Sequence, residues 1–131
     1  MNEQGQKIIL FMLKHNFRQL RIWIDSVALA KDIYALTQKF TNEHKFGISS
    51  QLYRSAVSIP SNIAEGTARK SSKEFSHFLT ISLGSAFELE TQLIIAEECE
   101  LATHEKLQEL ISRTQLLQKQ ITAFSNSIYN L

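Results

Sequence analysis

The residues best spaced for metal chemistry in the 131-residue sequence are Glu74 and His77, in the stretch EFSH. A Glu-x-x-His pair on a helix is half of the ligand set of a di-iron four-helix bundle. That chemistry needs the pair twice, together with a glutamate from each of the two other helices. This sequence contains the pair once, and Glu74 also suits the start of a helix. We therefore predict no metal site and no cofactor.

The other groups capable of catalysis are isolated from one another. His15, His44 and His104 lie outside the expected helix cores and have no second ligand at metal spacing. The glycines form no phosphate-binding loop, and no serine lies in a Gly-x-Ser-x-Gly pattern. The single cysteine, Cys99, excludes an intramolecular disulfide, favours a reducing cytoplasm, and is more often a small core residue than a nucleophile. We predict a protein that is not an enzyme and has no catalytic residue.

The elements that must position these side chains are helices. The sequence has only one proline and four glycines, the residues that most favour turns. We therefore expect few, long secondary-structure elements in a single domain over 1–131. Three segments repeat apolar or small residues at alternating three- and four-residue spacing, as amphipathic helices do. The expected buried rows are Leu20, Trp23, Val27, Ala30, Tyr34 and Thr37; Phe75, Leu79, Ser82, Ala86, Leu89, Leu93 and Ala96; and Leu107, Leu110, Thr114, Leu117, Ile121, Phe124 and Ile128.

The ends of these helices carry capping signals. The stretch TNEHKFG at 41–47 separates the first helix from the second. Ser71 with Glu74 three residues later is a capping box for the next helix. Thr103 followed closely by Glu105 suits the start of the last helix, because oxygen acceptors and negative charge are favourable at a helix N-terminus.

The only proline lies in SAVSIPSNIAEG, residues 55–66, where the helical spacing of apolar residues continues on both sides: Ile48, Leu52, Ala56, Ile59 and Ile63. A loop would normally reset that phase. Proline removes one backbone donor and crowds the carbonyl four residues earlier, which kinks a helix without necessarily ending it. We predict one helix from about Gly47 to Gly66, kinked at Pro60. The alternative is a helix–loop–helix with Ser58, Ser61 and Asn62 as turn residues.

Four helices with short connections predict an all-α fold, an antiparallel up-down four-helix bundle. Residues 1–13 form a short N-terminal extension that packs against the bundle or a neighbouring subunit. Their apolar run, IILFML at 8–13, is too short to span a bilayer, and no small residues follow it as a signal-peptide cleavage site would require. We expect no membrane attachment.

Two of the helices, 47–66 and 75–96, carry apolar residues beyond a single stripe. Four helices cannot bury all of these, so we predict a homo-oligomer in which the excess meets another subunit. The alternative is that they are scattered exposed apolar residues, which are normal on monomers. The small residues at 84–86 also favour close packing of another helix. The expected interface contains Tyr53, Val57, Ile81, Leu83 and Phe87.

The net charge of +1 conceals an asymmetry along the chain. Residues 14–73 carry ten basic and four acidic side chains, whereas residues 74–110 carry eight acidic side chains and Lys106 alone. Such an imbalance marks either an anion-binding face or basic helices that compensate an acidic one. The candidate phosphate contacts are Arg18, Arg21, Lys45, Arg54, Arg69, Lys70 and Lys73. Glu65 is expected to orient or neutralise part of this patch.

The stretch from Phe46 to Leu93, with SIPSNIAEG at its centre, resembles the signature of a known four-helix-bundle family. That family is named for proteins encoded in intervening sequences of large-subunit ribosomal RNA genes. The motif residues that carry the resemblance and the kink are Ser58, Pro60, Asn62, Glu65 and Gly66. The weaker stretches FRQLRIW at 17–23 and YALTQKF at 34–40 are similar to the first helix of the family.

The resemblance implies a left-turning helical bundle, usually a ring-like homopentamer, without an established enzymatic activity. It also implies likeness in architecture to an accessory protein of diversity-generating retroelements, which binds nucleic acid and a reverse transcriptase. Thr41 replaces the usual proline of the family, and Tyr53 stands where a basic residue is common, which weakens the basic face.

Two functions therefore remain open. One is a nucleic-acid-associated module, with RNA or a nucleic-acid-processing protein as partner. The other is a protein-interaction scaffold, which the near-neutral charge suits better, because nucleic-acid-binding domains are typically strongly basic.

Overall fold

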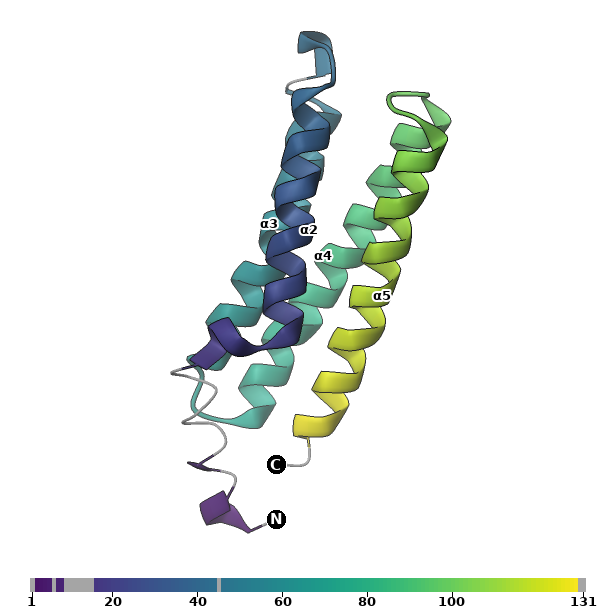
Figure 1. Ribbon diagram of the computed structural model, residues 1–131. Coiled ribbons are helices and arrows are strands. Elements are labelled where there is room, and N and C mark those ends of the chain that lie inside the picture. Colours follow the sequence, from purple (N-terminus) through teal and green to yellow (C-terminus); the bar gives the residue numbers. More distant parts are fainter. Residues whose placement is uncertain (1, 6, 9–15, 45, 130–131) are drawn as a thin grey trace.

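The computed structural model describes residues 2–5, 7–8, 16–44 and 46–129, and four long helices dominate it (Figure 1). They are α2 (Arg21–Gln38), α3 (Ile48–Thr67), α4 (Ser72–Glu98) and α5 (His104–Tyr129). Two short 3₁₀ turns, η1 (Phe17–Gln19) and η2 (Asn42–His44), precede α2 and α3. Successive helices run in opposite directions, which confirms the all-α antiparallel arrangement. Of the extension at 1–13, residues 1, 6 and 9–13 lie outside the described part.

Helices α4 and α5 begin where the capping residues predict, whereas α2 and α3 have no side-chain cap. The Ser71 hydroxyl accepts a hydrogen bond from the Glu74 backbone N–H at 3.2 Å, and the Glu74 carboxylate in turn accepts one from the Lys70 backbone N–H at 3.3 Å. Thr103 accepts a bond from the Lys106 backbone N–H at 3.2 Å in the same way. These contacts satisfy donors that the first turn of a helix leaves free. Because these caps start α4 and α5 soon after the preceding helix ends, the two connections are short.

Helix α3 is continuous through Pro60, so the prediction of one helix is confirmed and the helix–loop–helix alternative is wrong. The carbonyls around the proline have side-chain partners. Ser61 donates to the Val57 carbonyl at 2.8 Å, and Ser82 of α4 donates to the Ile59 carbonyl at 2.9 Å. Proline deprives the Ala56 carbonyl, four residues earlier, of its usual helical donor, and the side-chain bonds add donors to the nearby Val57 and Ile59 carbonyls. The kink itself stays a prediction.

The core confirms three of the four predicted rows. Every residue of the α4 row is buried, and in α3 and α5 only Ile48 and Phe124 are partly exposed. In α2 the predicted row is only partly correct, because Ala30 and Thr37 are buried but Val27 and Tyr34 face outward. The row that α2 buries is Ile22, Ser26, Leu29, Ile33 and Leu36. Ser26 tolerates complete burial because its hydroxyl donates to the Trp23 carbonyl at 2.9 Å.

Gly66 lies inside the last turn of α3 and does not have the left-handed conformation of a terminal glycine, which corrects its expected role as the end of the helix. A Cβ atom at this position would come within 2.8 Å of Phe75 Cδ1 and 2.9 Å of Phe78 Cβ. Glycine is therefore required because α4 approaches the backbone of α3 too closely for any side chain.

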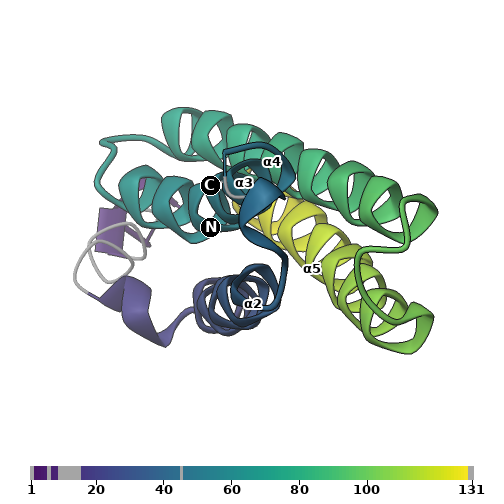
Figure 2. The ribbon, with the colours of Figure 1, turned by 90° about the horizontal axis from the view of Figure 1, so that it is seen from above.

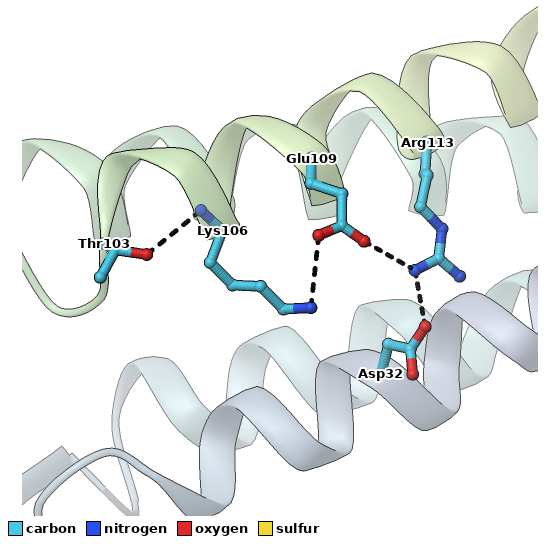
Figure 3. Close-up of polar contacts among 5 residues, drawn as sticks. All are labelled: Asp32, Thr103, Lys106, Glu109 and Arg113. Atoms are coloured by element: carbon cyan, nitrogen blue, oxygen red, sulfur yellow. Dashed lines mark hydrogen bonds and ion pairs between the residues drawn. The ribbon is translucent and has the colours of Figure 1, made fainter.

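The arrangement of the helices follows their order in the chain. Helix α3 packs against both α2 and α4, and α5 lies along α4 (Figure 2). Helices α2 and α5 meet less extensively, and a hollow of about 420 Å³ remains between the end of α2 and the α4–α5 connection. Figure 3 shows the polar contact that joins them: Arg113 Nη1 lies 2.6 Å from Asp32 Oδ2 and 3.8 Å from Glu109 Oε1. A partly exposed ion pair therefore bridges α2 and α5 above the apolar core that both helices share.

Candidate functional site

The fold brings most of the candidate phosphate contacts to one end of the bundle. Arg18 lies in η1 and Arg21 begins α2. Arg69 and Lys70 lie in the α3–α4 connection and Lys73 in the first turn of α4, at the lower end in Figure 1. These five residues are called the basic end. Two predicted contacts do not belong to it. Arg54 lies in the first half of α3, and Lys45 lies outside the described residues.

Arg69 is the most constrained side chain of the basic end. Its guanidinium lies 3.2 Å from Glu65 Oε1 and 4.6 Å from the centre of the Phe78 ring. The expected contact of Glu65 with the basic patch is therefore present, and it neutralises one charge. Cation–π contact with Phe78 holds the same guanidinium flat against the surface of α4. Arg69 consequently offers an anion only the donors that remain free of both partners.

The surface beside Arg69 is hollowed. An open depression of about 620 Å³ is lined by Arg69, Ser71, Lys73, Glu74, His77 and Phe78. The Lys70 and Lys73 ammonium groups form no ion pair in the part of the chain that the structure describes, whereas Arg21 pairs with Asp25 at 3.3 Å. The capping of α4 uses the backbone donors of Lys70 and Glu74 internally. An anion here would therefore rely on the two lysines more than on the helix terminus.

The family-motif residues Ser58 and Asn62 form a polar seam between α3 and α4. Asn62 Nδ2 donates to the Ser58 carbonyl at 2.8 Å and to its hydroxyl at 3.0 Å, while the Ser58 and Ser85 hydroxyls lie 2.8 Å apart. Farther along, Ser55 donates to Glu88 at 3.1 Å. The Ser58–Ser85 and Ser55–Glu88 bonds cross to α4, while Asn62 holds Ser58 within α3, so the geometry gives the seam a packing role. Sequence spacing alone could not show it, because the partners are 27 and 33 residues away.

Exposed apolar side chains gather on two separate faces. The first, called the α2–α3 face, contains Ile24, Val27, Tyr34 and Tyr53, and the Tyr34 and Tyr53 rings lie 5.4 Å apart. The sequence predicted Tyr53 for an interface, and it did not predict that the three residues from α2 are exposed, because they were assigned to the core or to no row. Val57 follows Tyr53 by one helical turn and is half-buried.

The second face is the outward side of α4 and is called the outer α4 face. It contains the exposed residues Ile81, Gly84, Phe87, Ile94 and Ile95. Ile81 and Phe87 were predicted for the interface. Leu83, also predicted there, is half-buried and packs against the core. By length and composition α4 is the one helix among the described residues that could cross a membrane, although its main row is packed inside this bundle.

Most of the residues considered for metal binding or catalysis lie in the part of the chain that the structure describes. No metal cluster forms among the described residues, because no group of three histidine, cysteine, aspartate or glutamate side chains is placed there to hold a metal ion. Glu74 and His77 are both exposed at the start of α4, where Glu74 completes the cap. Cys99 is exposed beyond the end of α4, so the expectation of a core residue is wrong.

The fold and sequence are similar to known proteins over most of the chain. A family model described as 23S rRNA-intervening sequence protein matches residues 18–123. A crystal structure from Bacteroides thetaiotaomicron, of a protein with unknown function from the S23 ribosomal protein family, superposes with a TM-score of 0.75 at 28% sequence identity. That similarity covers 79% of this chain and 97% of the other. No curated protein matches the sequence.

Proposed function

The chain belongs to the 23S rRNA-intervening sequence protein family, and we propose that it is a non-enzymatic, homo-oligomeric helical-bundle module that associates with RNA. The observation that carries the oligomer is the pair of apolar faces described above. Phe87 is 52% exposed, Tyr34 49% and Ile95 46%. Large side chains gathered on two faces favour burial against protein, whereas scattered single residues would not.

The first test is the oligomeric state. We expect light scattering to give a mass that is a multiple of the chain's 15.0 kDa at micromolar concentration. Five copies are the expected number, because the resemblance of the SIPSNIAEG segment to the family implies a pentamer. A stable monomer across the concentration range would contradict the proposal.

RNA association is supported by the basic end. Five basic side chains gather there against the carboxylates of Asp25, Glu65 and Glu74, which leaves a modest positive excess in one copy. An oligomer repeats that excess in each subunit, so a weak patch gains strength through multiple contacts. Contacts of this kind are made to the phosphate backbone and tolerate changes in sequence.

The second test removes the positive charge of the α3–α4 connection. Replacing Arg69, Lys70 and Lys73 together by alanine is expected to weaken binding of a single-stranded RNA at least tenfold at low salt. The slope of log affinity against log salt should fall in magnitude by about 2, because each lost phosphate contact removes about 0.7 from it. Titrations at two salt concentrations measure both quantities.

The matched control for this test is Lys119→Ala, an exposed lysine on α5 outside the basic end. It should leave affinity and slope unchanged. If the triple variant retains the wild-type slope, the basic end is not the RNA contact. If the wild-type protein binds no RNA at low salt, the alternative is favoured: a protein-interaction scaffold. The ion pair of Arg69 with Glu65 is the observation that supports this alternative, since it removes charge from the patch.

A further inference from the structure

Helix α3 begins without a cap, unlike α4. Gly47 stands in the capping position and has no side chain that could accept a hydrogen bond. The Gln51 N–H donates to the Gly47 carbonyl at 3.2 Å, but the N–H groups of Ile48, Ser49 and Ser50 have no partner among the described residues. Such a terminus attracts an anion, because its donors point away from the helix and the helix dipole adds positive charge.

A buried hydroxyl beside these donors also lacks a partner. Ser49 is only 8% exposed, and its Oγ atom has no hydrogen-bond partner in the part of the chain that the structure describes. Buried hydroxyls are nearly always bonded, because an unpaired one costs free energy. Ser26 of α2 and Thr114 of α5, which are fully buried, each donate to a carbonyl of their own helix. Ser49 is in the first turn of α3, where no preceding helical turn supplies such a carbonyl.

Ser49 and Ser50 line a hollow of about 310 Å³ between the end of α2 and the start of α3. This hollow lies at the end of the bundle opposite the basic end (Figure 1). Its lining also includes Asn42 of η2 and the rings of Tyr34 and Tyr53, which lie 5.4 Å apart. Both tyrosines are close to half exposed, so a planar group can stack against them. Hydroxyls, uncapped N–H groups and aromatic rings thus surround one space.

Arg54 adds positive charge next to this lining. It follows Ser50 by one helical turn, is exposed, and has no ion-pair partner within the described ranges. Helical side chains lean toward the N-terminus of their helix, so the Arg54 side chain is directed toward the turn that contains Ser50. Glu43, the only acid in the sequence between α2 and α3, accepts a bond from Thr41 and contacts His44. Arg54, a predicted phosphate contact outside the basic end, thus complements the uncapped terminus.

We propose that this hollow binds a nucleotide, with its phosphate at the start of α3 and its base against the tyrosine rings. The uncapped N–H groups, the Ser49 hydroxyl and Arg54 supply donors to the phosphate oxygens. The rings supply a stacking surface that every base can use. Inorganic phosphate or a nucleoside would each use only part of this lining, so the complete nucleotide fits best.

Titration of the full chain with adenosine 5′-monophosphate, followed by calorimetry, tests the site. Ser49→Ala should weaken binding about tenfold, the size expected for one hydrogen bond to a charged group. The same substitution should preserve or raise the unfolding midpoint, because it removes an unsatisfied buried hydroxyl. A serine with a purely structural role would instead lower the midpoint when replaced.

Ser76→Ala is the matched control. Ser76 of α4 is also 8% exposed, and its hydroxyl also has no partner within the described part of the chain, but it does not line this hollow. Its replacement should leave the affinity for adenosine 5′-monophosphate unchanged. Arg54→Gln is a second variant, at an exposed position that folding tolerates. It should weaken binding of adenosine 5′-monophosphate severalfold and leave the weaker binding of adenosine unchanged, because adenosine has no phosphate.

The source of the nucleotide is identified with a short RNA that carries a 5′-phosphate and the same RNA with a 5′-hydroxyl. These titrations use the variant in which Arg69, Lys70 and Lys73 are alanine, so that the basic end does not contribute. Tighter binding of the phosphorylated RNA than of adenosine 5′-monophosphate and of the 5′-hydroxyl RNA would assign the hollow to an RNA end. Tighter binding of adenosine 5′-monophosphate than of either RNA would assign it to a free nucleotide.

Failure of this proposal is distinguishable from failure of RNA association at the basic end. The triple alanine variant should bind adenosine 5′-monophosphate as the wild type does, because the two sites lie at opposite ends. No binding by the wild type at millimolar nucleotide would overturn the proposal and leave the Ser49 hydroxyl to water. Equal affinities of wild type and Ser49→Ala, or an equal loss in Ser76→Ala, would overturn it as well.

Discussion

Replacing Gly66 by valine is expected to lower the free energy of unfolding by about 3 kcal/mol, the upper part of the range for overpacked interiors. The first added atom already falls 2.8 Å from Phe75 Cδ1 and 2.9 Å from Phe78 Cβ. Neither contact is easily relieved. Phe75 is almost completely buried, and the Phe78 Cβ atom moves only with the backbone of α4. Helices α3 and α4 would have to separate, which would weaken the Ser82–Ile59 hydrogen bond nearby.

Urea unfolding followed by circular dichroism measures this effect. Gln51→Ala serves as the control, because Gln51 is exposed on the same helix and substitutions of that kind usually change stability by less than about 0.5 kcal/mol. Gly66→Ala should be intermediate, since better helix propensity offsets part of the clash. Equal midpoints for wild type and Gly66→Val would show that α3 and α4 are farther apart than described.

Replacing Phe75 by alanine is expected to lower the free energy of unfolding by about 3–5 kcal/mol, the usual range for deleting a buried aromatic ring. Its ring is 1% exposed and packs edge-to-face against Phe124 of α5, with centroids 5.8 Å apart. The same ring lies over Gly66 of α3. One side chain therefore joins three helices, and a cavity there cannot be closed by moving any one of them. The total free energy of unfolding of a domain is roughly 5–15 kcal/mol, so this one substitution removes a large part of it.

The measurement is again the free energy of unfolding, at a protein concentration low enough to separate folding from association. Leu116→Ala, a truncation of a 56% exposed side chain on α5, is the control and should change stability far less. A loss below about 1 kcal/mol for Phe75→Ala would mean that the lower part of the bundle can collapse around the gap.

The sequence predicted the buried rows of α3, α4 and α5, and misjudged part of the row of α2. The rows of α4 and α5 were identified although each includes a buried polar residue, Ser82 and Thr114. In α2 two rows compete, and the one that is buried includes Ser26. Its burial depends on a hydrogen bond to the Trp23 carbonyl, a local contact that hydrophobic spacing does not register.

The candidate site was predictable to the extent that it depends on chain neighbours. Lys70 and Lys73 are close in sequence, so their proximity needed no fold. The pairing of Arg69 with Glu65 follows from a one-turn separation, and its contact with Phe78 required the angle at which α4 leaves the connection. The role of Gly66 was misassigned for the same reason. A glycine near a helix end usually terminates it, and only the position of α4 shows that this one allows contact.

The closing contact between Asp32 and Arg113 has a bearing on how the chain folds. Each of the pairs α2–α3, α3–α4 and α4–α5 is joined by a short connection, so these pairs form at little cost in chain entropy. The Asp32–Arg113 contact instead joins two residues that are 81 positions apart in the sequence, and so closes a long loop. A topology dominated by such local pairs belongs to the fast-folding class, with the α2–α5 seam as its late step. We expect the same seam to open first in the native state, because α2 and α5 meet less extensively than the other neighbouring helices.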